Sequence, residues 1–284
     1  MPQNLSPQSS LPPLSVGNVV SAGIRLYRSH FKQYLGLSFK ALLWWLIPVY
    51  GWAKAATIIA MISRQGFCEL INQPESVGTT RGHLNPKLWS FLLTQILRIL
   101  IDIGISISLG IVSSFLMIIP AILITVFVKD SFVGISISTL LQTLINLITL
   151  GLQLWFQARF FVAELPLAIE NNVESTTTIV RSWQLTKGLT LKIQMVLLVA
   201  YLITIPLVSI AFLPLFFMIP LLSSRITQDT VTSIIVLLGL LCLILLSITN
   251  VLIRPFWQAI KAVIYYDLRS RKEGLGLQLR DRPI

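Results

Sequence analysis

The chain has 284 residues, of which 55% are hydrophobic and only 12% are charged, and its mean hydropathy is +0.80. A soluble domain carries about 25% charged residues, so this composition excludes a water-soluble fold. The net charge is +11, and Lys and Arg residues lie beside apolar segments, as expected for loops that face anionic lipid headgroups. The pattern predicts a membrane protein with no nucleic-acid partner.

Residues 1–13 hold four prolines and little to bury, which predicts a disordered tail. Residues 14–274 are expected to form the membrane domain, and residues 275–284 a polar C-terminal tail. From Leu14 to Tyr34 apolar residues recur mostly at spacings of three and four, with cations between them. This spacing predicts an amphipathic helix at the membrane interface.

The next apolar stretch, residues 35–71, has a proline and four aromatic side chains near its middle, in the run WWLIPVYGW at 44–52. Aromatic residues favour the membrane interface. We therefore expect a hairpin with helices at about 28–47 and 52–71, each long enough to span a bilayer at about 20 residues. A single kinked span over 35–61 is the alternative, which would give five spans in all and place the N-terminus outside.

The remaining apolar runs cover residues 89–128, 132–165, 193–222 and 231–253. Polar linkers at 73–88 and 170–192 separate them, with short turns at Lys129–Asp130 and 223–230. Prolines are expected to break the 193–222 run. The fold class predicted is therefore all-α: a polytopic bundle of about six transmembrane helices in three hairpins, plus interfacial amphipathic helices.

Basic residues gather at both ends of the membrane domain and in the two linkers, whereas the opposite turns hold only Lys54, Lys129 and Arg225. Cytoplasmic loops carry the excess of Lys and Arg. We therefore expect a multi-pass protein of the inner (plasma) membrane with cytoplasmic termini. The expected partners are a bilayer with anionic headgroups and, as a second possibility, another membrane protein.

Two helices carry polar stripes inside the apolar runs. One stripe repeats every three or four residues: Gln142, Asn146, Thr149, Gln153 and Gln157. The other repeats every four residues, so that Arg98 can pair with Asp102: Thr94, Arg98, Asp102 and Ser106. Such stripes face protein or water rather than lipid, and they serve either as interhelical hydrogen bonds or as the lining of a solute pathway.

The sequence predicts no catalytic residue, metal site or cofactor. Cys68 and Cys242 lie far apart, and His30 and His83 have no acidic or cysteine partner at metal-ligand spacing. Glycine-rich phosphate loops, G-x-S-x-G and H-E-x-x-H motifs are missing from the sequence. One enzymatic alternative remains, a lipid transferase that would use Glu164, Glu170 or Asp267 at headgroup level.

Two segments carry more specific information about the protein's family than its composition does. The first reads FVAELPLAIE at 161–170 and continues to RSWQLTKG at 181–188; the second begins with Arg254-Pro255 and ends in YYDLRSRKEG at 265–274. Together they resemble the bacterial membrane domain found with some glycerophosphoryl diester phosphodiesterases and its stand-alone relatives. That reaction belongs to a separate soluble barrel in the family, so the resemblance implies a membrane module without the hydrolase.

These segments are interpreted as a cytoplasmic interaction face with local ion pairs. Its candidate residues are Glu164, Glu170, Arg181, Ser182, Asp267, Arg269, Arg271 and Glu273. The function predicted is a non-enzymatic scaffold or accessory module of the cell envelope that acts with lipids or a protein partner. A transporter of a small or amphiphilic solute is the alternative, with the two polar stripes lining its path.

Overall fold

The structure is a computed structural model that describes residues 15–128, 131–171, 173–222 and 228–274. Both expected tails, the turn at Lys129–Asp130 and most of the turn at 223–230 lie outside these residues. Within the described ranges the fold is all-α, without strands. The elements are α1 (Val16–Ser29), α2 (Phe31–Trp45), α3 (Tyr50–Leu70), α4 (Val77–Leu84), the 3-10 turn η1 (Asn85–Lys87), α5 (Leu88–Phe127), α6 (Ser131–Phe160), α7 (Glu164–Ile169), α8 (Ser175–Thr186), α9 (Thr190–Leu222) and α10 (Gln228–Glu273).

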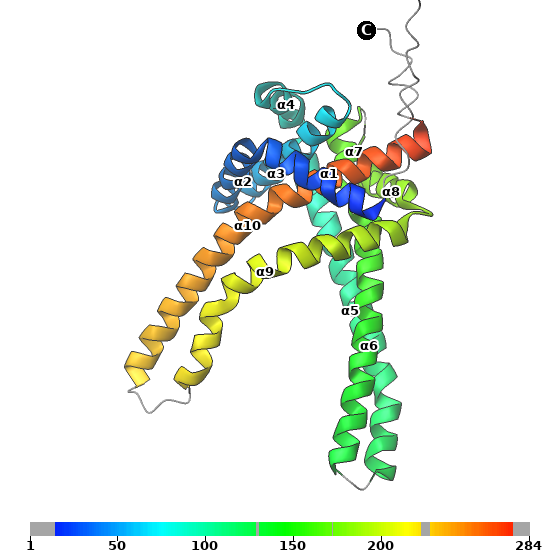
Figure 1. Cartoon of the computed structure of the whole chain (residues 1–284), viewed down its shortest axis with the longest axis vertical. Coiled ribbons are helices and arrows are strands. Elements are labelled where there is room, and N and C mark those ends of the chain that lie inside the picture. The colour runs from blue at the N-terminus through cyan, green and yellow to red at the C-terminus, as the bar shows by residue number, and fades with distance from the viewer. Residues whose placement is uncertain (1–14, 129–130, 172, 223–227, 275–284) are drawn as a thin grey trace, which may run out of the picture.

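Two long hairpins, α5–α6 and α9–α10, project from a cluster of shorter helices and diverge from each other (Figure 1). They contain the four helices that are long and apolar enough to cross a membrane, as counted over the described residues. Residues 103–127, 131–158, 193–222 and 232–253 carry no charged side chain. Each of these stretches exceeds the about 20 residues that a bilayer requires.

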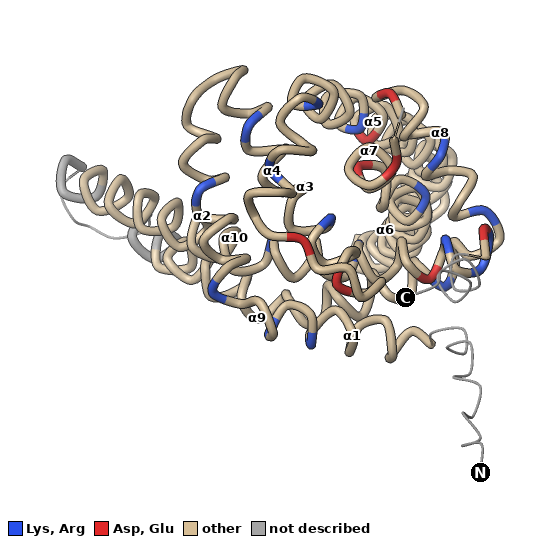
Figure 2. Tube along the Cα trace, turned by 90° about the horizontal axis from the view of Figure 1, so that it is seen from above, with Lys and Arg blue, Asp and Glu red and all other residues tan. Residues whose placement is uncertain are grey.

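We call the cluster of shorter helices, together with the adjoining ends of the long ones, the head. Figure 2 shows Lys, Arg, Asp and Glu on the head, whereas the described outer lengths of α9 and α10 are tan. Charges begin on the four long helices at Asp102, Arg159, Lys192 and Arg254, all near the head. The ring pair of Tyr201 and Trp257, with centroids 4.8 Å apart, lies in the same zone. Charges and aromatic rings at one level are typical of a membrane boundary.

The expected six spans are not confirmed, because neither α2 nor α3 is among the four apolar helices. Figure 2 looks along the hairpin α5–α6 and shows α2 and α3 from the side, so this pair runs across the long hairpins. Lys54, near the start of α3, donates a 2.9 Å hydrogen bond to Asn85 Oδ1 in η1. Since η1 precedes the head end of α5, Lys54 lies on the head and not on an opposite turn, which corrects its expected place.

The turn between α2 and α3 is tight, and its sequence explains why. Val49 has a φ of 58°, a left-handed value that is rare for a β-branched residue. Gly51 follows, and a Cβ at this position would lie 2.1 Å from Trp44 O. Only glycine lets α3 begin this close to the end of α2. The turn is surfaced by apolar side chains, with Trp45 56% and Leu46 75% exposed.

The prolines within the long helices do not end them. α5 continues through Pro120, α10 through Pro255, and α9 through Pro206 and Pro214. The expected break of the 193–222 run is therefore wrong, but Figure 1 shows α9 bending along its length. Each proline removes one backbone hydrogen bond and crowds the preceding turn, which bends a helix without ending it.

Two apolar cores hold the head together. The first joins α1 to α9 and α10, with Val19, Val196 and Ile260 almost fully buried. A Cβ on Gly23 would lie 2.8 Å from Ile260 Cγ1, so glycine permits the close approach of α1 to α10. The second core joins α2 and α3 to α4, α5 and α7 and is lined by Tyr34, Ala41, Met61, Ile62, Leu84, Phe91 and Leu167.

Candidate functional site

The predicted interaction face lies on the head, where α7 and α8 meet the C-terminal half of α10. α8 begins with a capping box in which Glu174 accepts from a backbone N–H of the first turn and Thr177 accepts from the Glu174 N–H. A box of this kind satisfies donors that helix geometry leaves free. It fixes the start of the helix that presents Arg181 and Ser182.

The packing face of α8 consists largely of hydroxyl groups. Thr178 Oγ1 donates to Ala163 O at 2.5 Å, and Ser182 Oγ donates to Arg159 O at 2.8 Å. The side chains of Thr178 and Ser182 are both fully buried. Arg159 O lies in the last turn of α6, where backbone carbonyls lack intrahelical partners, and Ala163 is the N-cap residue of α7. Ser182 therefore caps the end of α6, a structural role within the predicted face.

Glu164 and Lys261 form an ion pair in the centre of the head. Lys261 Nζ lies 2.7 Å from Glu164 Oε1, and each side chain is only 9% exposed. Arg98 lines a small void beside Glu164, together with Thr94 and Gln95 of α5. Asp102 lies 3.8 Å from Arg98, so two acids and two bases from three helices balance in charge. The two buried members of this group, Glu164 and Lys261, are stable only when each charge has its partner.

The end of α7 is joined to α8 and α10 through Glu170. Tyr265 donates to Glu170 Oε1 at 2.5 Å, and Arg181 Nε lies 3.4 Å from the same oxygen. Arg181 also pairs with Glu273, which accepts a 2.8 Å bond from Arg269 Nε. These five residues are the C-terminal cluster of the head. Glu170 and Tyr265 lie 95 positions apart in the sequence. The cluster therefore depends on the tertiary fold.

Asp267 joins α9 to α10. Its Oδ2 accepts from Lys192 Nζ at 2.8 Å and from Arg271 Nε at 3.0 Å. Arg271 is one helical turn away on α10, whereas Lys192 begins the head end of α9. The structure thus brings all eight residues predicted for the interaction face onto one part of the head: seven in three neighbouring groups of contacts, and Ser182 at the end of α6.

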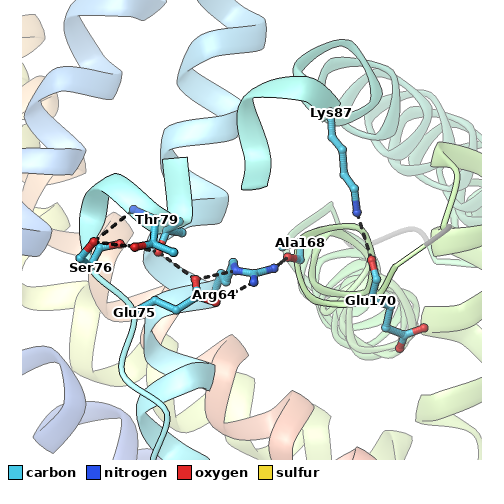
Figure 3. Close-up of polar contacts among 8 residues, drawn as sticks. Arg64, Glu75, Ser76, Thr79, Lys87, Ala168 and Glu170 are labelled. Carbon is cyan, nitrogen blue, oxygen red and sulfur yellow. Dashed lines mark hydrogen bonds and ion pairs between the residues drawn. The ribbon is translucent and has the colours of Figure 1, made fainter. Parts of the chain in front are cut away.

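A further ion pair, missed by the sequence analysis, ties α3 to the α3–α4 linker (Figure 3). Arg64 contacts Glu75 through two bonds, Nη2 to Oε1 at 2.7 Å and Nε to Oε2 at 2.9 Å. Its third nitrogen donates to Ala168 O at 2.5 Å. This fork holds the pKa of the Glu75 carboxyl below its usual value. Lys87 closes the same region by donating to Leu167 O and Glu170 O at 3.1 and 3.0 Å.

The polar stripes of the long helices lie partly within and partly below the head. Gln157 Oε1 accepts a 3.1 Å bond from Tyr201, which joins α6 to α9, and Gln153 Nε2 lies 3.5 Å from Ser106 Oγ on α5. Gln142 Nε2 donates to Asn146 Oδ1 at 2.9 Å within α6. The stripe therefore makes interhelical contacts at its head end and a local contact farther out.

Among the residues that the structure describes, no group of three His, Cys, Asp or Glu side chains gathers where it could hold a metal ion. His30 does have an acidic neighbour, with Nδ1 3.0 Å from Glu69 Oε2, which corrects its expected isolation. This contact joins the start of α2 to the end of α3.

Comparisons with family models, with curated proteins and with solved structures found no match to this chain. The function is therefore inferred from the residues and their geometry.

Proposed function

We propose that the chain is a non-enzymatic scaffold of the inner (plasma) membrane, in which two apolar hairpins hold the head at the cytoplasmic surface. The observation that carries this proposal is a difference between the acidic and the basic side chains of the head. The acidic side chains form contacts within the fold, whereas many basic side chains face outward. The outward cations then meet anionic lipid headgroups or an acidic partner.

The acids used in this way are Glu69, Glu75, Asp102, Glu164, Glu170, Glu174, Asp267 and Glu273. The bases that are exposed, and for which the described residues offer no ion-pair partner, are Arg25, Arg28, Lys32, Lys40, Arg81, Lys187 and Lys272. A surface with this balance is attracted to a negative membrane face by about 1 kcal/mol per cation close to it.

This proposal includes four crossings, with the α2–α3 pair on the cytoplasmic side and with cytoplasmic termini. An even number of spans supports this orientation, because α1 and the end of α10 both belong to the head. The aromatic turn between α2 and α3 then enters the headgroup region from the same side, where exposed Trp side chains are favoured. The six-span arrangement of three hairpins would require this turn to reach the opposite surface.

The contacts of the carboxylates favour a scaffold over the lipid-modifying enzyme. Glu164, Glu170 and Asp267 each contact a cation, and the first two also belong to buried or half-buried junctions between helices. A general acid or base must reach a substrate proton. A scaffold is also favoured over a transporter, because Gln157 of the polar stripe accepts a hydrogen bond from Tyr201 on the neighbouring helix instead of lining a solute path.

The resemblance to the membrane domain of phosphodiesterases supports the same proposal, since that module is separate from the hydrolase barrel. Its characteristic segments, 161–188 and 254–274, form the ion-paired junctions of the head. In this proposal these residues hold the surface in shape, and the surface itself provides the interaction.

Purification from native membranes in mild detergent tests the proposal. A scaffold retains a membrane-protein partner at fixed stoichiometry, and reversing charge on the head surface with Arg81→Glu and Lys272→Glu should release it. Leu237→Ala, on the apolar outer part of α10, is the matched control and should retain the partner. Solute uptake that depends on the chain and is abolished by Asn146→Leu with Gln153→Leu would instead support transport and overturn the scaffold.

A further inference from the structure

An apolar groove of about 480 Å³ lies between α2 and α10. Leu35, Phe39 and Leu42 of α2 form one wall, and the α10 segment 240–252 forms the other. Its volume falls in the range of about 300–1,000 Å³ that is typical of small-ligand sites. Ser247 is the one polar residue of the lining, and its hydroxyl donates to Leu243 O at 2.8 Å within its own helix. The groove thus accepts an apolar occupant.

The position of the groove identifies the source of that occupant. Residues 240–252 belong to the uncharged stretch of α10, and this helix is among the four that could cross a membrane. α2 runs across α10 at the head end of this stretch. The groove therefore opens at the level where lipid chains meet their headgroups, so an apolar ligand there has its polar end beside the head.

Helical spacing places two cations beside the groove. Arg254 follows Ser247 and Val251 at spacings of seven and three, which places it on the groove face of α10. Lys32 precedes Leu35 and Phe39 by three and seven positions on α2. Tyr27 of α1 connects the start of α2 to α10. Its hydroxyl donates to Leu252 O on α10 at 3.0 Å, and its ring contacts the ring of Phe31 on α2 at a centroid distance of 5.3 Å.

Neither cation has a counterion among the residues that the structure describes. Arg254 is half-buried and Lys32 is exposed, and no hydrogen-bond acceptor or carboxylate among the described residues contacts either side chain. This differs from the long-helix charges Arg98, Lys192 and Lys261, which each have an acidic partner. A half-buried guanidinium without an acid, next to lipid, is costly unless an anion pairs with it.

We propose that the groove is a binding site for one anionic phospholipid of the surrounding bilayer. One acyl chain lies between α2 and α10, and Arg254 and Lys32 hold the phosphate. The planar guanidinium can donate two parallel hydrogen bonds to phosphate oxygens, and Lys32 adds a second positive charge. This inference goes beyond a scaffold role and does not depend on it, since lipid binding at this groove is measured without any protein partner.

Native mass spectrometry of the full chain with equal amounts of phosphatidylglycerol and phosphatidylcholine tests the headgroup. The wild type should prefer phosphatidylglycerol by about tenfold, the value of one charge-assisted contact. Arg254→Gln and Lys32→Gln should each remove most of this preference, whereas Arg254→Lys should keep part of it. Arg81→Gln removes a cation of the head surface that is not part of the groove; it controls for the general attraction of anionic lipid and should lower the preference far less than Arg254→Gln does. An unchanged preference in Arg254→Gln would overturn the proposal.

Filling the groove tests the acyl chain independently. Ser247→Trp places a large side chain in the groove and should lower the affinity for both lipids by about tenfold or more. Leu241→Trp adds the same bulk to α10 outside the groove lining and should bind lipid as the wild type does. The unfolding midpoint of each variant in detergent verifies that the fold is retained. A folded Ser247→Trp variant that binds phosphatidylglycerol like the wild type also contradicts the proposal.

Discussion

Glu164 and Lys261 contact each other at 2.7 Å across 97 positions of sequence, and each side chain is only 9% exposed. The pair joins α7 to the head end of α10 and so ties the two long hairpins to one head. Taking two charges out of water is costly, and their mutual attraction roughly offsets this cost. The pair therefore specifies which helices meet more than it adds to stability.

The first prediction separates these two roles. Lys261→Met leaves Glu164 as a buried charge and should lower the free energy of unfolding by about 3–5 kcal/mol. Adding Glu164→Gln removes the stranded charge, so the double variant should lose less than the single one. Denaturant unfolding in detergent measures both values. Lys272→Met, an exposed cation near the end of α10, is the control and should change stability by less than about 0.5 kcal/mol.

Equal losses in the single and the double variant would contradict this account. They would mean that the contact of Lys261 Nζ with the Phe161 ring, 5.5 Å from its centroid and lost in both variants, matters more than the pairing with Glu164.

The second prediction concerns pH and the pair of Arg64 with Glu75. The hydrogen bonds from Arg64 lower the pKa of Glu75 from its ordinary 4.5. A lowered pKa in the folded state means that the unfolded chain takes up the proton first. The pair thus contributes its full stability above pH 4.5, and this contribution is lost as the pH falls below that value toward the lowered pKa.

Unfolding midpoints measured from neutral pH to below pH 4.5 test this dependence. Wild type should be more stable than Glu75→Gln at neutral pH, and the difference should shrink steadily in acid. Glu174→Gln is the control, because its side chain is exposed and Gln keeps an oxygen that can cap α8. A difference that stays constant across the range would mean that shape, rather than ionisation, explains the effect of the substitution.

The sequence predicts the class of fold well, because lipid imposes strong rules on composition. Long runs such as 103–127 can be only membrane helices or buried cores, and the pairs α5–α6 and α9–α10 follow from the turns between them. The pair α2–α3 is different. Its apolar pattern matches that of a span, but the side chains of α3 are buried against protein, as Met61 and Ile62 show. Hydropathy alone does not separate burial in protein from burial in lipid.

The sequence predicts only part of the candidate site, because it shows where charges lie but not which charges meet. The charged motif at 265–274 indicated where ion pairs gather, but the partner of each charge depends on tertiary contacts. Lys261 is the only charged residue between Arg254 and Asp267, and a lone cation in an apolar stretch indicates a buried acid somewhere. Its partner, Glu164, lies in another segment, and nothing in local spacing identifies it.

The third prediction tests the hydroxyl face of α8. Ser182→Ala removes the donor to Arg159 O and should destabilise the fold by about 1 kcal/mol, the usual value of one hydrogen bond. Ser182→Leu should cost more, because the fully buried site has no room for a larger side chain. Thr176→Ala, on the exposed side of the same helix, is the control. If Ser182→Leu were neutral, α8 would not pack against the end of α6 as described.

The fourth prediction concerns topology. The native thiols should not interfere with cysteine labelling, because Cys242 is buried and burial raises the pKa of Cys68 to about 11. Three positions then report on sidedness to a membrane-impermeant maleimide: Val49→Cys in the α2–α3 turn, Arg81→Cys on α4 and Phe127→Cys at the outer end of α5. The contact of Lys54 with Asn85 places the turn with α4.

Labelling of sealed vesicles of both orientations decides between four and six crossings. With four, Val49→Cys and Arg81→Cys react from one side and Phe127→Cys from the other. With six, Val49→Cys reacts together with Phe127→Cys, because α2 and α3 would then cross the bilayer. Solubilising the vesicles provides the control that each thiol is reactive. The same result also bears on the lipid groove, since a crossing α2 would present Lys32 and Leu42 at different depths and separate the acyl-chain wall from the cation pair.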